Sequence, residues 1–404
     1  MIIAVAVNRK AEYRLYPKPD QAKDLERICA VAAECYNLAL AERKWLYHEW
    51  GNSFGFSQQC SHIKLWRESR PGWQEVHVHI LQVALKRLDL AFSHFFCRVK
   101  TGETPGFPRY KKADRFSGFG FKEHGNGWAF LGNKIRLAGV GEVKIRGKTR
   151  HHGKPTTVEI FKRAGKWFAS VTLRLEVAPH RDHGQGEVGL DWGVENFLTQ
   201  SHQDGSFSEV ANPRHLNKSL QRLKVLQRAV FRRKKGSKRR ENKKLSVQNA
   251  FLKVANQRKD FCHKTANRLV QENRLIAVEK LSVKSMVQGD GQASLHRNIL
   301  DATPNLFHQI LKCKAEEAGS CKVVEIDPLL RKPSQTCHVS GNVQKKELSQ
   351  RTHTLPDGKV ISRDRNSARV ILQYAWGWEP SPRGEGWLQP SKIRETSPIF
   401  GFAN

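Results

Sequence analysis

Three acidic residues stand at positions where a carboxylate could do chemistry. Asp191 ends the apolar run VGLD, Glu279 ends LIAVE, and Asp364 lies in SRDRNSARVIL, where a polar loop turns into an apolar helical segment. Converging carboxylates can hold Mg²⁺ or Mn²⁺ for phosphodiester hydrolysis, with one ion activating water and another stabilising the leaving oxygen. Because a single acid at a strand end is commonly only a turn or cap residue, the hypothesis depends on the three together.

A second chemical feature is the basic run FRRKKGSKRRENKK, which places nine Lys or Arg residues in positions 232–244. It joins two helical patterns, so we interpret it as a phosphate-binding loop. The candidate contacts in it are Arg232, Arg233, Lys234, Lys235, Lys238, Arg239 and Arg240. A solvated helical tip and a nuclear-import signal are the other interpretations of such a run.

Two segments interleave aromatic with basic residues, YRLYP near the N-terminus and GFPRYKK at 106–112. Such sets can stack on unpaired bases and clamp the nucleic-acid backbone. Tyr and Phe beside Pro are at least as often core residues. From the second segment we name Arg109 and Lys111 as candidate contacts.

Composition supports an anionic partner. The 404 residues include 70 Lys or Arg against 38 Asp or Glu, a formal net charge of +32 that needs a polyanion to offset its self-repulsion. No run approaches the about 18 apolar residues of a membrane span, and we expect no signal peptide. Eight cysteines are scattered without a CxxC pair, which indicates a reducing, intracellular setting. A nucleic-acid binder is the favoured class.

The surrounding pattern predicts the elements that must position these residues. A short apolar strand at 2–7 precedes helical periodicity from about residue 18 to 100, and alternating runs bounded by Gly predict a small antiparallel barrel or sandwich at about 103–178. The early strand could join that sheet, making the helical block an insertion. After residue 186, strands alternate with helices, which predicts an α/β core carrying the acids.

Nine blocks in order resemble the TnpB family, RNA-guided endonucleases encoded by insertion sequences and related to type V CRISPR effectors. The blocks are YRLYPKPDQ, YNLAL, LQVALKRL, GFPRYKK, GLDWGVENF, the RRKKGS run, RLIAVEKL, PSQTCHVSG and RDRNSARVIL. They span roughly residues 10–375, close to the whole chain. No single block would be specific, but their order is.

The resemblance implies an α+β multidomain fold. A wedge-type β-barrel at 1–10 and 100–180 would be interrupted by a helical recognition lobe at 11–99. A RuvC nuclease domain, of RNase H-like α/β type, would occupy 186–326 and 359–376 around a small target-nucleic-acid-binding insert at 327–358. We expect the Pro-, Gly- and Trp-rich tail at 377–404 to be disordered.

The resemblance also implies roles. Asp191, Glu279 and Asp364 match the three RuvC motifs and would be both catalytic residues and Mg²⁺ (or Mn²⁺) ligands, while Gln82 matches a position that contacts a short motif beside the target. The implied partners are a guide RNA and target double-stranded DNA, with no membrane. We expect a monomer in the RNA complex, with a dimer as the alternative, in a prokaryotic cytoplasm, associated with the nucleoid.

One departure from the family concerns its CxxC…CxxC zinc ribbon. The corresponding segments read CHVSG at 337–341 and HTLPDG at 353–358. Cys337, His338, His353 and Asp357 could be imagined as ligands, but adjacent Cys and His rarely bind one ion, so we expect no structural zinc and a possible weakening of cleavage. The alternatives are a compact type V CRISPR effector and an RNA-guided DNA-binding protein with weak or no cleavage. A DDE-type transposase would also use three carboxylates, but it fits the nine blocks poorly.

Overall fold

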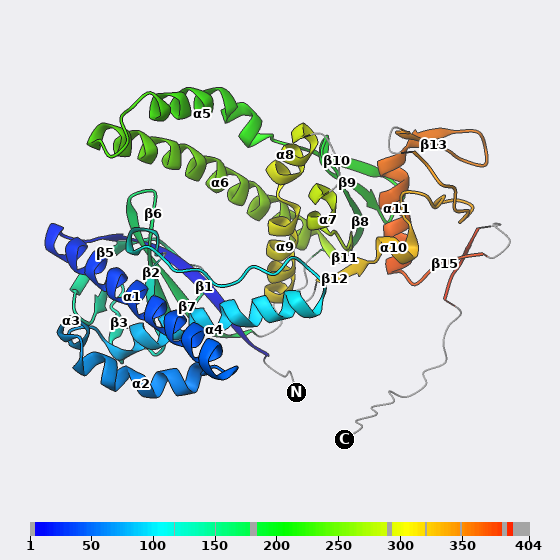
Figure 1. The fold of residues 1–404 in the computed structure, drawn as a ribbon. Coiled ribbons are helices and arrows are strands. Elements are labelled where there is room, and N and C mark those ends of the chain that lie inside the picture. Colours follow the sequence, from blue (N-terminus) through cyan, green and yellow to red (C-terminus); the bar gives the residue numbers. More distant parts are fainter. Residues whose placement is uncertain are drawn as a thin grey trace, which may run out of the picture. The chain divides into compact units, whose positions relative to one another are not determined.

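The computed structural model describes residues 5–116, 118–149, 151–177, 184–288, 293–319, 321–347, 350–381 and 386–390. The chain forms two compact units, one over residues 4–177 and one made chiefly of residues 178–404. Figure 1 shows their elements along the sequence. Each unit has its own hydrophobic core and is described separately.

A seven-stranded antiparallel sheet, in the order β2-β6-β7-β1-β5-β4-β3, forms the frame of the first unit. Its strands are β1 (Val5–Tyr16), β2 (Gly118–Phe121), β3 (Trp128–Phe130), β4 (Lys134–Leu137), β5 (Gly141–Arg146), β6 (Lys154–Arg163) and β7 (Lys166–Val177). Strand β1 does join this sheet, pairing with β7 and β5. It runs well beyond residue 10, because Ala11, Tyr13 and Leu15 alternate into the core. The predicted boundary between residues 10 and 11 therefore falls inside a strand.

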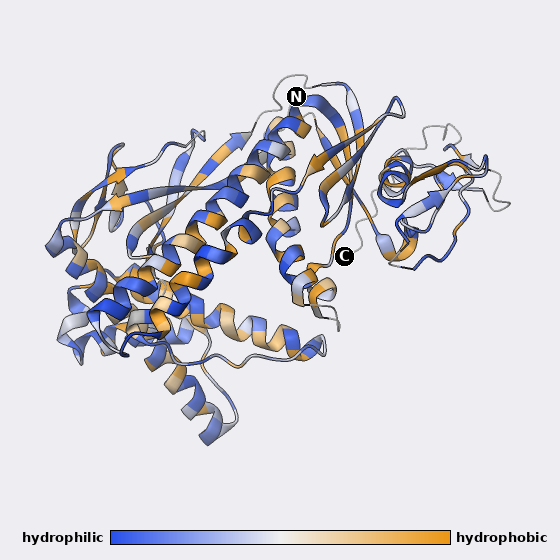
Figure 2. Ribbon diagram, turned by 90° about the horizontal axis from the view of Figure 1, so that it is seen from above, coloured by the Kyte–Doolittle hydropathy of each residue, from blue (hydrophilic) through white to orange (hydrophobic). Residues whose placement is uncertain are grey.

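The helical block of the first unit lies between β1 and β2 in the sequence. It consists of α1 (Pro19–Trp50), α2 (Phe56–Glu68), α3 (Pro71–Gln74), α4 (Val78–Lys100) and the 3₁₀ turn η1 (Ala113–Arg115). Leu25, Ile28 and Cys35, which recur at helical spacing along α1, are buried. They share one core with sheet residues such as Phe119 and Trp128, so the helices and the sheet fold as one body. Figure 2 shows that the helices of the chain carry both hydrophobic and hydrophilic residues.

A five-stranded mixed sheet, in the order β10-β9-β8-β11-β12, forms the second unit. Its strands are β8 (Gly186–Trp192), β9 (Asn196–His202), β10 (Phe207–Ala211), β11 (Asn273–Glu279) and β12 (Lys322–Ile326). The first three are antiparallel neighbours, whereas β8, β11 and β12 run parallel. This confirms the predicted α/β core, to which β10 adds an edge strand that the sequence pattern did not predict.

Helices cover both faces of this sheet, which is contacted by α6 (Lys238–Glu272), α9 (Pro304–Ala318) and α11 (Arg363–Ala375). The unit also contains α5 (His215–Phe231), α7 (Val283–Gln288), α8 (Ala293–Ala302) and α10 (Pro328–Arg331). In β11, Ile276 and Val278 pack into the core made with α6 and α9. Ala277 instead packs against Ile371 and Leu372 of α11. Because side chains alternate along a strand, α11 covers the face opposite α6 and α9.

Two small hairpins complete the second unit. They are β13 (Thr352–Thr354) with β14 (Val360–Ser362), and β15 (Glu379–Pro380) with β16 (Trp387–Leu388). The expectation of disorder from residue 377 is thus wrong for β15 and β16, because the Trp387 ring packs 5.0 Å from that of Tyr374. Residues 391–404 of the predicted tail lie outside the described residues. Among the helices described, none combines the length and apolar character needed to cross a membrane.

Candidate functional site

The strand register places two of the predicted acids side by side. Leu190 of β8 pairs with Val278 of β11 in parallel, and Asp191 and Glu279 are the next residue of each strand. Leu190 and Val278 face the α6 and α9 core. Since side chains alternate, both carboxylates face α11, at the carboxyl ends of their strands.

Helix α11 brings the third acid to this face. Asp364 is the second residue of the helix, and its backbone N–H donates to the Oγ of the capping residue Ser362 at 3.3 Å. One turn on, the Ser367 hydroxyl donates to Oδ1 of Asp191 at 3.2 Å. The structure therefore brings Asp191, Glu279 and Asp364 to one place from three segments far apart in sequence.

Gly189 makes this close packing possible. A Cβ at Gly189 would lie 2.1 Å from the carbonyl oxygen of Ala368 and 2.8 Å from Cβ of Leu372. Only glycine lets the α11 backbone approach β8 this closely. Gly189, the first glycine of the GLDWGVENF block, thus sets the height of Asp364 and Ser367 above the sheet.

The gathered acids bring like charges close together, and Arg363, 4.0 Å from Asp364, offsets them in part. Burial, followed by the charges of Glu279 and Asp364, raises the pKa of Asp191 well above its usual value. The Ser367 hydrogen bond and the Arg363 charge oppose this rise in the Asp191 pKa. Burial also raises the pKa of Glu279 to about 6. A nearby cation would relieve both effects.

The donor set fits a hard divalent cation, because carboxylate oxygens are what Mg²⁺ prefers. Over the residues described, no three His, Cys, Asp or Glu side chains are arranged closely enough to hold one ion. Asp191, Glu279 and Asp364 are near enough for their charges to interact. They would have to draw together around a metal.

Further contacts fix the start of α11. The Arg365 guanidinium donates to Glu209 of β10 at 3.1 and 3.0 Å, and Arg369 donates to the backbone oxygen of His202 at 2.9 Å. These bonds tie the helix to the antiparallel half of the sheet. The position of Asp364 therefore follows from the sheet as well as from its own helix cap.

Sequence reasoning missed Asn366, which is fully buried two residues after Asp364. Its Oδ1 accepts the backbone N–H of His338 at 3.0 Å, and its Nδ2 donates to the backbone oxygen of Thr336 at 2.7 Å. The predicted insert is thus docked on α11 beside the acids. The sequence signal that could have identified Asn366 is a polar residue in the first turn of a helix that continues into an apolar run.

The imagined zinc ligands Cys337, His338, His353 and Asp357 do not form one metal-binding group in the part of the chain that is described. The His338 ring is hydrogen-bonded to α11. His353 contacts the Lys346 ammonium through Nδ1, and Asp357 lies exposed at a turn beside a lysine. The absence of a structural zinc stays a prediction.

The basic run forms the tip of a helical hairpin made by α5 and α6. Of its candidate contacts, Arg232, Lys234, Lys235, Lys238 and Arg239 are exposed. Arg233 and Arg240 are half-buried and donate to the backbone oxygens of Ala229 and Arg233. Those two side chains hold the turn, so five of the seven candidates present free surface to a phosphate backbone.

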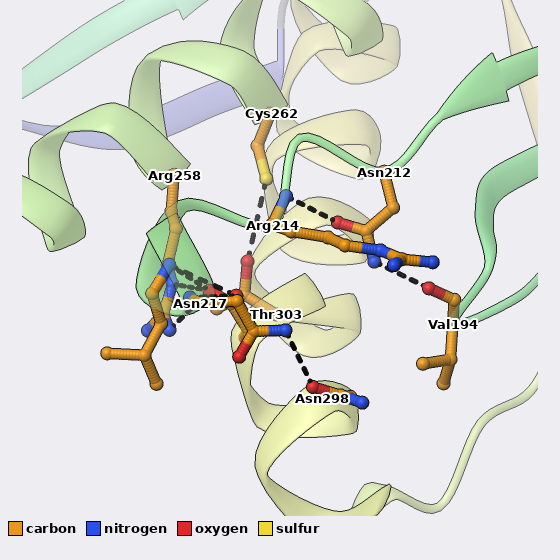
Figure 3. A network of polar contacts seen from close by, with 10 residues as sticks. Val194, Asn212, Arg214, Asn217, Arg258, Cys262, Asn298 and Thr303 are labelled. Carbon is orange, nitrogen blue, oxygen red and sulfur yellow. Dashed lines mark hydrogen bonds and ion pairs between the residues drawn. The ribbon is translucent and has the colours of Figure 1, made fainter. Parts of the chain in front are cut away.

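A buried polar network anchors the base of this hairpin (Figure 3). Asp301 of α8 is 4% exposed and accepts from the Arg258 guanidinium of α6 at 2.8 and 2.6 Å. It also accepts the backbone N–H groups of Leu216 and Asn217, which begin α5. Asn217 in turn donates to Asn298 at 2.9 Å. The basic tip is therefore carried on a fixed stem.

The remaining candidates lie in the first unit. Arg109 and Lys111 are exposed in the segment between α4 and η1, while Gln82 is half-buried on α4. The Asn37 side chain both donates to the backbone oxygen of Lys111 and accepts from its N–H, each at 2.8 Å. This clamp fixes the GFPRYKK segment on α1.

Comparison with known protein families gives three matches. The family described as "Probable transposase" matches residues 170–289, and "Cas12f1-like, TNB domain" matches residues 305–371. "Helix-turn-helix domain" matches residues 1–52, whose described part folds as strand β1 and the single helix α1.

Two relatives align along nearly the whole chain. A protein of Streptomyces pristinaespiralis named "Putative RNA-guided DNA endonuclease" is 30% identical over 393 residues, 96% of this chain and 93% of the relative. "Putative RNA-guided DNA endonuclease InsQ" of Escherichia coli K12 is 27% identical over 378 residues, covering 89% of this chain and 90% of that one.

A solved structure shares the fold. The protein of a Cas12f1–sgRNA–target DNA complex superimposes with a TM-score of 0.56 at 11% sequence identity. The match covers 91% of this chain and 98% of that one. The α+β multidomain architecture is thus common to both.

Proposed function

Because this chain belongs to the TnpB family, we propose that it cleaves DNA at sites selected by a guide RNA and that Asp191, Glu279 and Asp364 form the catalytic site. The observation that carries the proposal is the gathering of these three acids on the α11 face of the sheet, where the pKa of Asp191 is raised. A divalent cation is the expected means of offsetting such a cluster.

Asp191, Glu279 and Asp364 would hold Mg²⁺ or Mn²⁺, which when bound supplies an activated water and neutralises charge on the phosphate. Asp191 and Glu279 are fixed by the sheet, and Asp364 by the capped start of α11. The Ser367 hydroxyl orients Asp191 through its 3.2 Å hydrogen bond. These contacts hold the oxygen ligands near one edge of the sheet, and the three carboxylates would draw together around a bound metal.

The partners proposed are a guide RNA and target double-stranded DNA. The exposed cations of the α5–α6 tip, with Arg109 and Lys111, supply phosphate contacts that carry no sequence information. Sequence would be read by RNA–DNA pairing, while Gln82 contributes to reading a short adjacent motif. The RNA-bound protein is proposed to be a monomer.

The test is to co-express the chain with its downstream flanking DNA, sequence the RNA that co-purifies, and assay the complex on plasmids with randomised sequence beside the guide match. Specific RNA with Mg²⁺-dependent cleavage supports the proposal. Specific RNA with tight DNA binding but no cleavage would assign the chain to guided binding instead. An absence of bound RNA would overturn guidance. Repeats in the neighbouring DNA, in place of a transposon end, would indicate a CRISPR effector.

A further inference from the structure

The first unit carries a cluster of exposed aromatic rings on α4 and on the GFPRYKK segment that follows it. Phe96 of α4, and Phe107 and Tyr110 of the following segment, are 55%, 45% and 54% exposed. The Lys44 ammonium of α1 lies over the rings of both Phe107 and Tyr110, 5.5 and 4.9 Å from their centroids. We call Lys44, Phe96, Phe107 and Tyr110 the aromatic platform.

The rings of the platform are fixed by packing against α4 and by hydrogen bonds to α1. The Phe107 ring packs edge-on against Phe92 and Phe95 of α4, at 5.6 and 5.2 Å between centroids. Phe95 in turn lies 5.2 Å from Phe96. The Asn37 clamp on the Lys111 backbone fixes the other end of the segment. Rings fixed before binding lose little conformational freedom on contact with a ligand.

Charge around the platform identifies the class of ligand. Arg98, Arg109, Lys111 and Lys112 are exposed beside it in sequence. A Cβ on Gly106 would lie 3.2 Å from Nη1 of Arg98, so that guanidinium lies against the same segment. Exposed aromatic rings can stack on the bases of a single-stranded nucleic acid, and the neighbouring cations can bind its phosphates. Net charge of +32 makes an anionic ligand the complementary one.

We propose that the aromatic platform stacks unpaired bases of the guide RNA. The inference rests on the proposed function and adds a contact that pairing with target does not supply. The RNA is the favoured source because it carries unpaired bases before any target is met, whereas the bases of duplex DNA are paired. Stacking tolerates any base, so the platform would hold RNA without reading its sequence.

The test measures binding of the full chain to a labelled uridine oligomer of about 15 nucleotides across a salt series. Tyr110→Ala and Phe107→Leu are each expected to weaken binding about tenfold, with an unchanged salt slope, because stacking releases no counterions. Tyr110→Phe should bind like the parent, since it keeps the ring. Leu65→Ala, at a 65% exposed position on α2, is the matched surface control.

Equal losses for Tyr110→Ala and Tyr110→Phe would overturn stacking in favour of a hydroxyl contact. Unchanged binding by both Tyr110→Ala and Phe107→Leu, with circular dichroism like the parent, would also overturn it. A marked preference for a thymidine oligomer of equal length would assign the platform to single-stranded DNA and overturn the RNA source. Guided cleavage by the parent chain is scored separately, so failure of the platform and failure of the proposed function are distinct results.

Discussion

At the scale of single residues, Glu279 shows that burying an acid in the candidate site lowers the stability of the folded protein at neutral pH. Burial raises its pKa from 4.5 to about 6. The folded protein therefore binds more protons than the unfolded chain between these two values, and stability falls as the pH rises through that window. The resulting loss in the free energy of unfolding amounts to about 2 kcal/mol once the pH exceeds 6.

We predict that Glu279→Gln stabilises the metal-free protein at neutral pH. The gain over the parent should be near zero at pH 4.5 and grow to about 2 kcal/mol above pH 6, because glutamine does not ionise. Thermal or urea unfolding in chelator across this range measures it. A gain that is equal at both ends of the range would show that charge at Glu279 is not the cause.

Residue types and spacing singled out three acids that the fold brings close together, because each interrupts an apolar strand or helix whose type the pattern indicates. Their catalytic role stays a prediction. Lys44 and Asn366 escaped prediction for a different reason. Lys44 lies over Phe107 and Tyr110 only because the chain returns to α1 more than sixty residues later, counting from the sequence. Asn366 binds an insert segment that no local pattern brings near it.

At the scale of elements, the packing of α11 on β8 sets the height of Asp364 and Ser367 above the sheet. The close approach at Gly189 leaves no room for a side chain, since the nearest obstacle is backbone. Helical period and strand alternation predicted these two elements, but the distance between them depends on one missing Cβ. The full length of β1 was missed because its partner β7 is distant in sequence. The β15–β16 hairpin was missed because its strands are too short to show a pattern.

Gly189→Ala is expected to destabilise the chain by about 3 kcal/mol, the upper range for forcing an extra carbon into a packed interior, and to lower cleavage by displacing α11. Thermal unfolding and single-turnover cleavage measure the two effects. Gly72→Ala is the matched control, because a Cβ there meets nothing within 4 Å. Equal unfolding temperatures for the two variants would contradict the close approach.

The α5–α6 hairpin gives a second prediction at this scale. Replacing exposed Lys234 and Lys235 with Gln should lower the magnitude of the salt slope of RNA binding by about 1.5, as expected for two lost phosphate contacts. Lys23→Gln with Lys359→Gln removes the same charge at two other exposed positions and should change the slope little. An unchanged slope for the hairpin variant would show that its tip does not contact phosphate.

At the scale of the whole molecule, the net charge and the family of the chain both indicate a nucleic-acid partner. A net charge of +32 is complementary to an anionic partner, and two separately cored units carry the aromatic platform and the three acids. Composition predicted the class of partner, and the order of nine sequence blocks predicted the family. Neither could predict how the insert is held, since His338 contacts Asn366 of α11 and His353 contacts Lys346.

The most direct test of the account compares the parent and Asp191→Asn as purified RNA complexes. Both are assayed on a plasmid bearing the guide match, with Mg²⁺, with Mn²⁺ and with chelator. We predict divalent-metal-dependent cleavage by the parent and a loss of about 10³-fold or more in Asp191→Asn, because several kcal/mol of charge stabilisation is removed. The RNA content should be retained, and the unfolding temperature should be no lower than that of the parent. Cleavage by Asp191→Asn at the parental rate, or parental cleavage in chelator, would contradict the account.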